Sequence, residues 1–266
     1  MKKIIILTSD NAFQKYFVNE LSSNFIISGV FIIGDGSFVN RIKSLKSRYK
    51  SNLIFALFKR YYNKSLNKKI QELLYPESDN EKLIIYNKLF DSKWKCFQNE
   101  DNIFYNKRFQ FDDWYDEIYK ISPDVIIVHG GGWISKKIIN LAKDYTINLH
   151  WGHSPFYRGS NCTAFAFYNS DKKSVGVTIH ELSNKIDGGD IYDVGFPELS
   201  DHDSVFSAEM KLTVLGSSII IKLMKGYFLD GIIKSKPQDL SKGKLYLVKH
   251  MSIKIAKIIN DKFINN

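Results

Sequence analysis

The sequence predicts an α/β fold in which a mostly parallel sheet has helices on both faces. Short runs rich in Ile and Val alternate with segments of helical periodicity, which is the order of elements in parallel sheets. In addition, 44% of the 266 residues are hydrophobic, enough for a sizeable core. We expect one large domain over residues 1–200, with a basic and irregular insertion at about 37–108, and a helical extension over 201–266 packed on the same core.

The first elements follow this alternation. Residues 3–10 are a short apolar run that ends in polar residues. Ser9 or Asp10 can cap a helix that continues through Leu21. Residues 25–36, FIISGVFIIGDG, then predict a second buried strand that ends in a turn.

The insertion has two parts of different composition. Residues 37–71 carry ten Lys or Arg and no acidic residue, with the apolar stretch LIFALF at 53–58 in their middle. This pattern predicts a solvated helix with one buried stripe, although such a segment could also bind an anionic membrane surface or a nucleic acid. Residues 75–108 are rich in Asn, Asp, Lys and aromatic residues, and we expect an irregular stretch there.

Regular alternation returns after the insertion. The expected elements are, in chain order, a helix at 111–123, a strand and glycine turn at 124–132, a helix at 134–144, a strand at 145–150, and two strands around a turn at 174–195. A long helix from Ser204 to Lys225, a short strand at 243–248 and a terminal helix follow. Ligands of such sheets bind in the crevice at the carboxyl ends of the strands.

Composition limits the classes of function. The two cysteines, Cys96 and Cys162, are too few for a disulfide framework and favour a reducing compartment. The apolar run at the N-terminus is too short for a signal peptide, and no later stretch approaches the apolar length of a membrane span, so we expect a cytoplasmic protein. The formal net charge of +10 permits polyanionic partners without naming one. The glycine clusters at 34–36 and 130–132 lack the spacing of nucleotide-binding loops.

A polar cluster marks the end of the strand at 145–150. Asn148 and His150 are two residues apart, so both side chains should point to the same face of the sheet. Downstream, Asp187 begins the sequence DGG, where glycines free the backbone. An isolated His near a strand is more often structural than catalytic, but Asn, His and a glycine-framed Asp together favour a site.

The cluster belongs to a longer pattern, N-x-H-x-x-x-x-P-x-x-R-G followed by D-G-G, whose defined positions are Asn148, His150, Pro155, Arg158, Gly159 and Asp187 to Gly189. This pattern resembles the signature of the formyltransferases that use N10-formyltetrahydrofolate. The resemblance covers residues 124–191 in both order and spacing. It implies a Rossmann-like formyltransferase fold, whereas the N-terminal half matches that family only in its alternation of elements.

The resemblance also implies roles for individual residues. Asn148, His150 and Asp187 match the family's catalytic triad. N10-formyltetrahydrofolate is then the co-substrate, and we expect Tyr157 and Arg158 to contact the acceptor substrate. The turn residues that match those cradling the folate pteridine are Gly131, Gly132, Trp133 and Ile134.

The residue types suit formyl transfer without a metal. An amine that attacks a formyl carbon creates negative charge on the formyl oxygen, to which an Asn amide and a protonated His can donate hydrogen bonds. Asp187 can orient His150 and accept the amine's proton directly or through water. A hydrolytic zinc site of His150, His153 and Asp187 is a competing hypothesis, which strand alternation opposes because it sends positions 150 and 153 to opposite faces.

The acceptor depends on the rest of the chain. The residues after Gly195 predict two helices and a short strand rather than the tRNA-binding barrel of methionyl-tRNA formyltransferases. The stretches LHWGHSPFYRGSN and KGKLYLVKHM are similar to sugar N-formyltransferases, which act on nucleotide-linked 4-amino-4,6-dideoxy sugars for lipopolysaccharide O-antigen and other surface polysaccharides. We therefore expect a nucleotide-linked amino sugar as partner. The alternatives are another small amine, such as glycinamide ribonucleotide, or a non-enzymatic basic module that binds membrane or nucleic acid.

Several expectations are independent of the acceptor. We expect no nucleic-acid partner and no stable membrane contact, and the helix from Ser204 could supply a homodimer face. Trp151 and His153 depart from common members of the family. For Trp151 we expect packing under a helix rather than stacking on a ligand, and for His153 no catalytic role.

Overall fold

The computed structural model describes residues 2–33, 53–98, 101–106 and 110–264. Its centre is a seven-stranded sheet in the order β3-β2-β1-β4-β5-β7-β8. The five strands from β3 to β5 in this order are parallel, whereas β5, β7 and β8 pair in antiparallel fashion. The predicted α/β class with a mostly parallel sheet is therefore confirmed. The strands are β1 (Ile4–Ser9), β2 (Ile27–Ile33), β3 (Ile103–Asn106), β4 (Val125–His129), β5 (Tyr145–His150), β7 (Val177–His180) and β8 (Ile191–Gly195).

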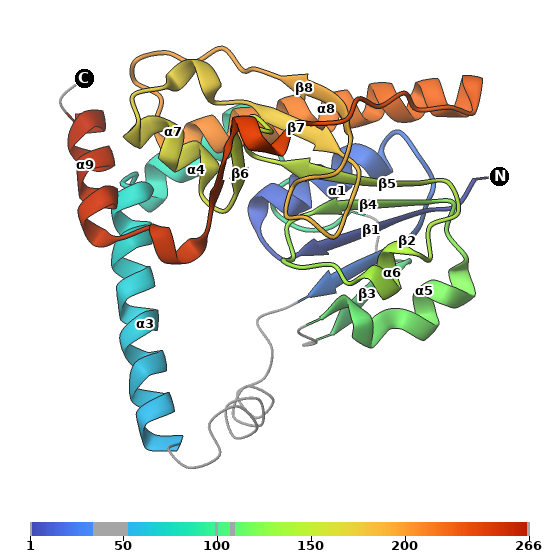
Figure 1. Cartoon of the computed structure of the whole chain (residues 1–266), viewed down its shortest axis with the longest axis horizontal. Coiled ribbons are helices and arrows are strands. Elements are labelled where there is room, and N and C mark those ends of the chain that lie inside the picture. Colours follow the sequence, from blue (N-terminus) through green and yellow to red (C-terminus); the bar gives the residue numbers. More distant parts are fainter. Residues whose placement is uncertain (1, 34–52, 99–100, 107–109, 265–266) are drawn as a thin grey trace.

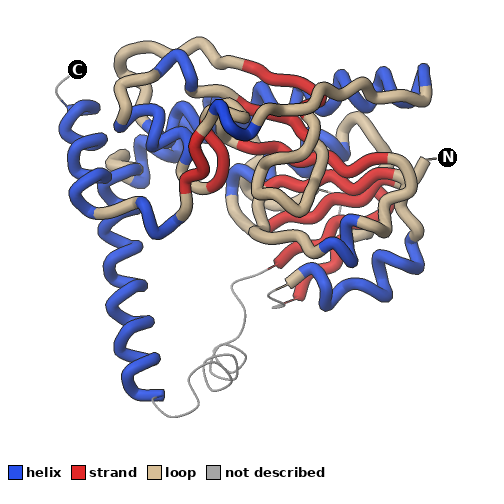
Figure 2. Tube along the Cα trace, in the orientation of Figure 1, coloured by secondary structure: helices blue, strands red, loops and turns tan. Residues whose placement is uncertain are grey.

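Helices cover the sheet on both of its faces (Figure 2). Alternate residues of β1 enter two separate cores, with Ile4 and Ile6 in the first and Ile5 and Leu7 in the second. Burial on both faces explains the uninterrupted apolar runs that predict the strands. The first core is covered by α1 (Ala12–Ser22) and α8 (Val205–Asp230), and the second by the short helix η1 (Phe111–Trp114), α5 (Tyr115–Ile121) and α6 (Lys136–Ile139).

The cap of α1 differs from the expected one. β1 continues through Ser9, and Asp10 forms an ion pair with Lys15, whose Nζ lies 3.0 Å from the Asp10 carboxylate. The cap is instead Asn11, whose side-chain oxygen accepts a hydrogen bond from the Phe13 backbone N–H at 3.1 Å. The prediction of Ser9 or Asp10 as the cap is wrong because Ser9 still belongs to β1 and the helix begins only at Ala12.

The helices of the middle region are shorter than predicted. The segment 111–123 divides into η1 and α5, and the segment 134–144 is helical only over Lys136–Ile139. After α6, the Lys143 N–H donates to the Pro123 carbonyl at 3.1 Å and the Asp144 N–H donates to the Asp124 carbonyl at 2.9 Å. These bonds draw the chain back to the start of β4 and end the helix early.

The stretch 75–108 is more regular than predicted. It contains the edge strand β3 and the helix α4 (Asp79–Phe90). At the start of α4, Ser78 and Glu81 form a capping box, in which each side chain binds the other residue's backbone N–H. Phe90 is fully buried in a third core with Tyr16 and Phe206. The helix was missed because most of its other residues are polar or half-exposed, so no clear apolar period is visible.

The basic segment continues into α3 (Leu53–Leu74), which extends away from the body of the molecule (Figure 1). In the last turns of α3, Ile70 and Leu74 are buried in the first core, and the helix contacts α9 (Ile253–Ile264). In these turns Lys64, Lys68 and Lys69 are exposed, as expected of a solvated helix. Residues 34–52 and the LIFALF side chains lie outside the described residues.

The C-terminal region also contributes to the fold. The predicted strand near 243–248 is confirmed as β9 (Lys244–Tyr246), which pairs in parallel with β6 (Tyr157–Gly159). α7 (Cys162–Tyr168) follows β6, and the short helices are η2 (Lys172–Ser174), η3 (Leu240–Lys242) and η4 (Val248–His250).

The helix α8 corrects one prediction from composition. It is long and apolar enough to cross a membrane, with a mean hydropathy of 1.4 over its best window, so the statement that no stretch approaches a membrane span is wrong. The core helix of a soluble protein passes the same test. In the structure, Leu212, Ile220 and Met224 of α8 are fully buried in the first core.

Candidate active site

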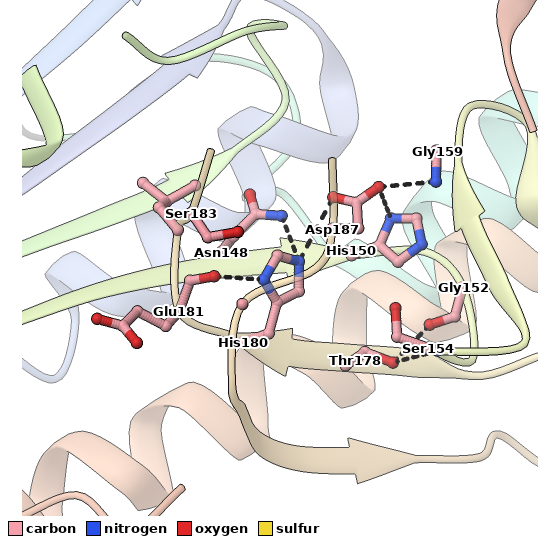
Figure 3. A network of polar contacts seen from close by, with 12 residues as sticks. Asn148, His150, Gly152, Ser154, Gly159, Thr178, His180, Glu181, Ser183 and Asp187 are labelled. Carbon is pink, nitrogen blue, oxygen red and sulfur yellow. Dashed lines mark hydrogen bonds and ion pairs between the residues drawn. The ribbon is translucent and has the colours of Figure 1, made fainter. Parts of the chain in front are cut away.

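Three side chains that the sequence singles out meet at the carboxyl end of β5 (Figure 3). Asn148 and His150 are the fourth and last residues of that strand, and Asp187 lies on the loop between β7 and β8. The Asp187 Oδ2 atom is 3.5 Å from Nδ1 of His150 and accepts a hydrogen bond from the Gly159 backbone N–H at 2.8 Å. His150 and Asp187 are 37 residues apart in the chain, and they meet because β7 runs antiparallel beside β5.

The hydrogen bonds of His150 define its proton positions. Its Nε2 atom lies 3.0 Å from the Tyr157 carbonyl oxygen, which can only accept, so Nε2 carries a hydrogen. Nδ1 faces the Asp187 carboxylate and carries a hydrogen only when the ring is charged. Burial lowers the pKa of His150, and the Asp187 carboxylate opposes this shift only in part. The ring is therefore neutral near pH 7, with an open position for a proton next to Asp187.

His180, the last residue of β7, is a fourth member of the cluster. Its Nδ1 donates to the Glu181 carbonyl at 2.7 Å, and its Nε2 lies 3.0 Å from the Asn148 amide nitrogen and 3.4 Å from Oδ1 of Asp187. Asn148 keeps a second amide N–H for a ligand. Sequence reasoning missed His180 because its role depends on the register that sets it directly opposite Asn148. The available signal was a His at the end of a strand seven residues before Asp187.

Asp187 is held as a carboxylate. Burial alone raises the pKa of its carboxyl group, but His150, His180 and the Gly159 amide together lower that pKa far below the usual range. The backbone of Asp187 has φ of 45°, a left-handed conformation that few non-glycine residues adopt. The low pKa makes Asp187 a weak base and a strong electrostatic partner for a charged ring beside it.

Two cavities meet at this cluster. The turn cavity, named for the glycine turn after β4, has a volume of about 310 Å³. The second cavity, named for His129 in its lining, has a volume of about 360 Å³. The residues that line both cavities are Gly132, Asn148, Gly159, Ser160 and Asp187. A group held in one cavity can therefore react with a group held in the other beside Asn148 and Asp187.

The glycine turn lies where the sequence predicts it. Gly131 and Gly132 have φ of +86° and +82°, which explains why glycine is needed at both positions. A Cβ on Gly131 would lie 2.7 Å from the Phe111 ring, whereas a Cβ on Gly132 would meet no atom within 4 Å. The turn cavity is lined by Gly132, Trp133 and Ile134, of which Trp133 is 61% exposed. Gly131 faces Phe111 rather than the cavity.

The His129 cavity is lined by buried polar side chains. His129 is enclosed, and burial lowers the pKa of its ring to about 4, so the ring is neutral. Neither of its ring nitrogens, nor Gln14 Oε1 nor Trp151 Nε1, makes a hydrogen bond within the described protein. Glu209 from α8 completes this wall, where burial raises its pKa to about 8 and the Tyr75 hydroxyl donates to its carboxyl at 2.7 Å.

Tyr157 and Arg158 are both buried and bonded internally. The Tyr157 hydroxyl donates to Asp171 at 3.0 Å, and the Arg158 guanidinium donates to the carbonyls of Pro155 and Leu240, both at 3.3 Å. Their side chains are absent from the described lining of both cavities. Neither side chain is placed to contact a ligand in either cavity, so their expected substrate contact is not supported by this geometry.

Trp151 and His153 lie apart from each other. Trp151 packs edge-on against Phe13 and His129, with ring centroids 5.1 Å apart in both cases. The His153 ring lies between Phe156 and Phe196, at centroid distances of 4.9 and 4.8 Å. Over the described ranges, no group of three or more His, Cys, Asp or Glu side chains is arranged to hold a metal ion. The zinc hypothesis with His150, His153 and Asp187 therefore has no geometric support.

The fold and this geometry agree with comparisons to known proteins. A family model described as formyl transferase matches residues 2–224, and the chain belongs to that family. A methionyl-tRNA formyltransferase from Lactobacillus gasseri is 32% identical over 127 residues, which are 47% of this chain and 40% of that relative. The match thus spans less than half of the relative's length.

Two solved structures show the same fold. An N-formyltransferase from Helicobacter canadensis, in complex with folinic acid and dTDP-3-aminofucose, aligns with a TM-score of 0.59 and 14% identity over 99% of this chain and 81% of its own. A phosphoribosylglycinamide formyltransferase from Streptococcus pneumoniae aligns with a TM-score of 0.50 and 15% identity over 86% of this chain and 99% of its own. At these identities the likeness concerns the fold, so the acceptor must be argued from the site.

Proposed function

We propose that the protein transfers the formyl group of N10-formyltetrahydrofolate to the amine of a nucleotide-linked amino sugar, of the dTDP-4-amino-4,6-dideoxyhexose type. The observation that carries this proposal is the pair of cavities that share Asn148 and Asp187. Transfer between two substrates requires two binding spaces that meet at one set of hydrogen-bonding and charged groups. Membership of the formyl transferase family supplies the reaction class.

The turn cavity fits the folate. A pteridine is flat, and the Gly132 backbone is open to close approach because no atom lies within 4 Å of the position where a Cβ would stand. Val128, Ile134 and Leu247 supply apolar contacts in the same cavity. Bound there, N10-formyltetrahydrofolate would supply an activated formyl carbon near the amide of Asn148.

The cluster can stabilise charge and move a proton. Asn148, held by His180, keeps an amide N–H for the negative charge that develops on the formyl oxygen. The proton lost by the attacking amine passes to the pair of Asp187 and His150. It rests on Nδ1 of His150, since the pKa of Asp187 is low and its carboxylate stabilises the charged ring. The same proton is then available to the departing folate nitrogen.

The His129 cavity suits a hydroxylated acceptor. Its wall combines an amide, an imidazole, an indole N–H and a carboxyl group that is protonated at neutral pH. Such groups can donate to or accept from the hydroxyls of a sugar ring. The basic surface of the chain, with a net charge of +10, suits the diphosphate of a nucleotide-linked sugar.

Mass spectrometry tests this proposal directly. The protein is incubated with N10-formyltetrahydrofolate and a panel of nucleotide-linked amino sugars, with glycinamide ribonucleotide included as the competing acceptor. We expect one sugar nucleotide to gain the mass of one formyl group. Formylation of glycinamide ribonucleotide alone would replace the sugar with that acceptor, and no formylation of any amine would reject the proposal.

Several parts of the proposal rest on the sequence alone. A cytoplasmic location, a homodimer and a place in surface polysaccharide synthesis stay predictions. Of the two cysteines, Cys96 is exposed and Cys162 is buried.

A further inference from the structure

The loop that carries Asp187 is braced by a distant part of the chain. We call residues 236–246 the C-terminal strap, which runs from the start of β8 to β6. At one end, Lys236 exchanges two backbone hydrogen bonds of 2.8 Å with Ile191, the first residue of β8. At the other end, β9 pairs with β6 along its whole length. The strap thus joins two segments on either side of Asp187.

Gln238 connects the strap to the Asp187 loop. Its side-chain amide donates to the Asp187 carbonyl at 3.0 Å and to the Gly189 carbonyl at a shorter distance. Both partners are carbonyl oxygens, which only accept, so the amide nitrogen must face them. The Gln238 Oε1 atom makes no hydrogen bond within the described protein. The donors of this one side chain therefore hold the carbonyls on both sides of Gly188.

The strap also holds the Gly159 backbone N–H, which donates to the Asp187 carboxylate. Gly159 belongs to β6, and β6 pairs with β9 of the strap. Arg158, also in β6, donates to the Leu240 carbonyl of the strap. The contact is close, because a Cβ on Gly243 would lie 1.7 Å from the Pro155 carbonyl oxygen. The backbone position and the carboxylate position of Asp187 therefore depend on the same segment.

We propose that Gln238 is a positioning residue for Asp187, which fixes the carboxylate between His150 and His180 from the C-terminal strap. The left-handed backbone of Asp187, with φ of 45°, needs such an external restraint. This role explains why the buried Arg158 of the N-x-H pattern faces the strap rather than a ligand. The kinetic consequence rests on the proposed formyl transfer, whereas the geometric consequence does not.

The test replaces Gln238 in the full chain. Gln238→Leu removes both hydrogen bonds, and Gln238→Glu sets a carboxylate against two carbonyl oxygens. Gln71→Leu, on an exposed position of α3, is the matched control. Loss of position at a reacting group costs up to about a hundredfold in rate, so we expect kcat to fall about ten- to a hundredfold in both Gln238 variants. We expect both KM values to change less than about threefold, because the other residues that line the two cavities stay in place.

A second measurement is independent of any substrate. The imidazole NMR signals of His150 and His180 report on the carboxylate between them. We expect Gln238→Leu to shift these signals in the direction produced by Asp187→Asn, and Gln71→Leu to leave them unchanged. If the wild-type protein formylates no amine, the proposed function fails while this measurement still decides the role of Gln238.

The outcomes separate positioning from general stability. Wild-type kcat and wild-type His150 and His180 signals in Gln238→Leu would overturn the proposal. A fall in thermal stability with unchanged ring signals would also overturn it, since the strap would then be structural only. Should Gln238→Leu not fold, Gln238→Asn keeps the amide but shortens its reach, and the same two measurements apply to it with the same expected directions.

Discussion

The turn cavity and the His129 cavity meet at the same residues but are built differently. The turn cavity is bounded mostly by loops, and its Trp133 and Ile186 are 61% and 39% exposed. The His129 cavity is bounded by side chains from three regular elements, with Gln14 on α1, His129 on β4 and Glu209 on α8, all of them buried. The first cavity therefore offers backbone and apolar surface, whereas the second offers enclosed polar groups.

This difference suggests that the two cavities bind different substrates and contribute differently to specificity. A backbone turn can accept any flat ring of the right size, which suits a folate that many enzymes share. Enclosed polar side chains discriminate more strongly, because a ligand that leaves them unpaired loses the desolvation energy of each group. We expect the identity of the acceptor to depend on the His129 cavity, and substitutions in the two cavities should therefore have separable effects.

The largest effect is expected where the cavities meet. Replacing Asn148, His150 or Asp187 by Ala should lower kcat by at least about a hundredfold, because each removes a donor or a proton carrier used in the transition state. Rates are measured with both substrates saturating, and circular dichroism confirms folding. The exposed His202 provides a matched control, since His202→Ala should keep wild-type rates. Near-normal turnover of His150→Ala would contradict the assignment.

The second largest effect concerns Glu209 in the His129 cavity. Its pKa in the folded protein is about 8, against about 4.5 when exposed, so between these pH values the folded state keeps a proton that the unfolded state has lost. Stability from this group is complete below about pH 4.5 and is lost as the pH rises toward 8. Glu209→Gln should remove this dependence, worth a few kcal/mol in the free energy of unfolding.

Chemical denaturation at several pH values measures this dependence. We expect Glu209→Gln to become more stable relative to the wild type as the pH rises from 5 to 9, and parallel pH profiles would refute the assignment. Tyr75→Phe, which removes the hydroxyl that donates to Glu209, tests whether that bond favours the charged form.

Prediction from the sequence fails most for residues whose role depends on contacts with distant parts of the chain. The strands β1 and β4 could be predicted because both faces of each are buried, which explains their runs of four apolar residues, Ile4–Leu7 and Val125–Val128. Asn148, His150 and Asp187 could be assigned from spacing and family pattern. His180, Glu209 and Gln238 could not, because each gains its role from register or packing against a residue far away in the chain. The helix α4 could not be predicted for a local reason, because its residues show no clear apolar period.

A third prediction compares the two glycines of the turn. Gly132→Val introduces strain at φ of +82° and a side chain into the turn cavity, so it should weaken folate binding about tenfold while binding of the sugar nucleotide changes less. Gly131→Val should instead lower the melting temperature, since its side chain would meet Phe111. Calorimetric titration with each ligand and thermal melts separate the two. Equal loss of both ligands in Gly132→Val would contradict this, and would mean that the new side chain also blocks the His129 cavity, which Gly132 lines as well.

The smallest effect is expected from α3, which contributes no described residue to the lining of either cavity. Lys64, Lys68 and Lys69 are exposed, and the ion pair of Lys68 with Glu72 is a solvated one with a distance of 3.7 Å. Such charges contribute little to stability and act on ligands only within about 10 Å at 0.1 M ionic strength. Replacing all three by Ala should therefore change the KM of the sugar nucleotide, and co-sedimentation with anionic vesicles, less than about threefold.

A membrane-facing helix would behave differently, because each basic residue at such a surface contributes about 1 kcal/mol. Loss of vesicle binding with unchanged kinetics would show that α3 acts at a membrane, and a raised KM that becomes insensitive to salt would show that it guides the nucleotide to the His129 cavity.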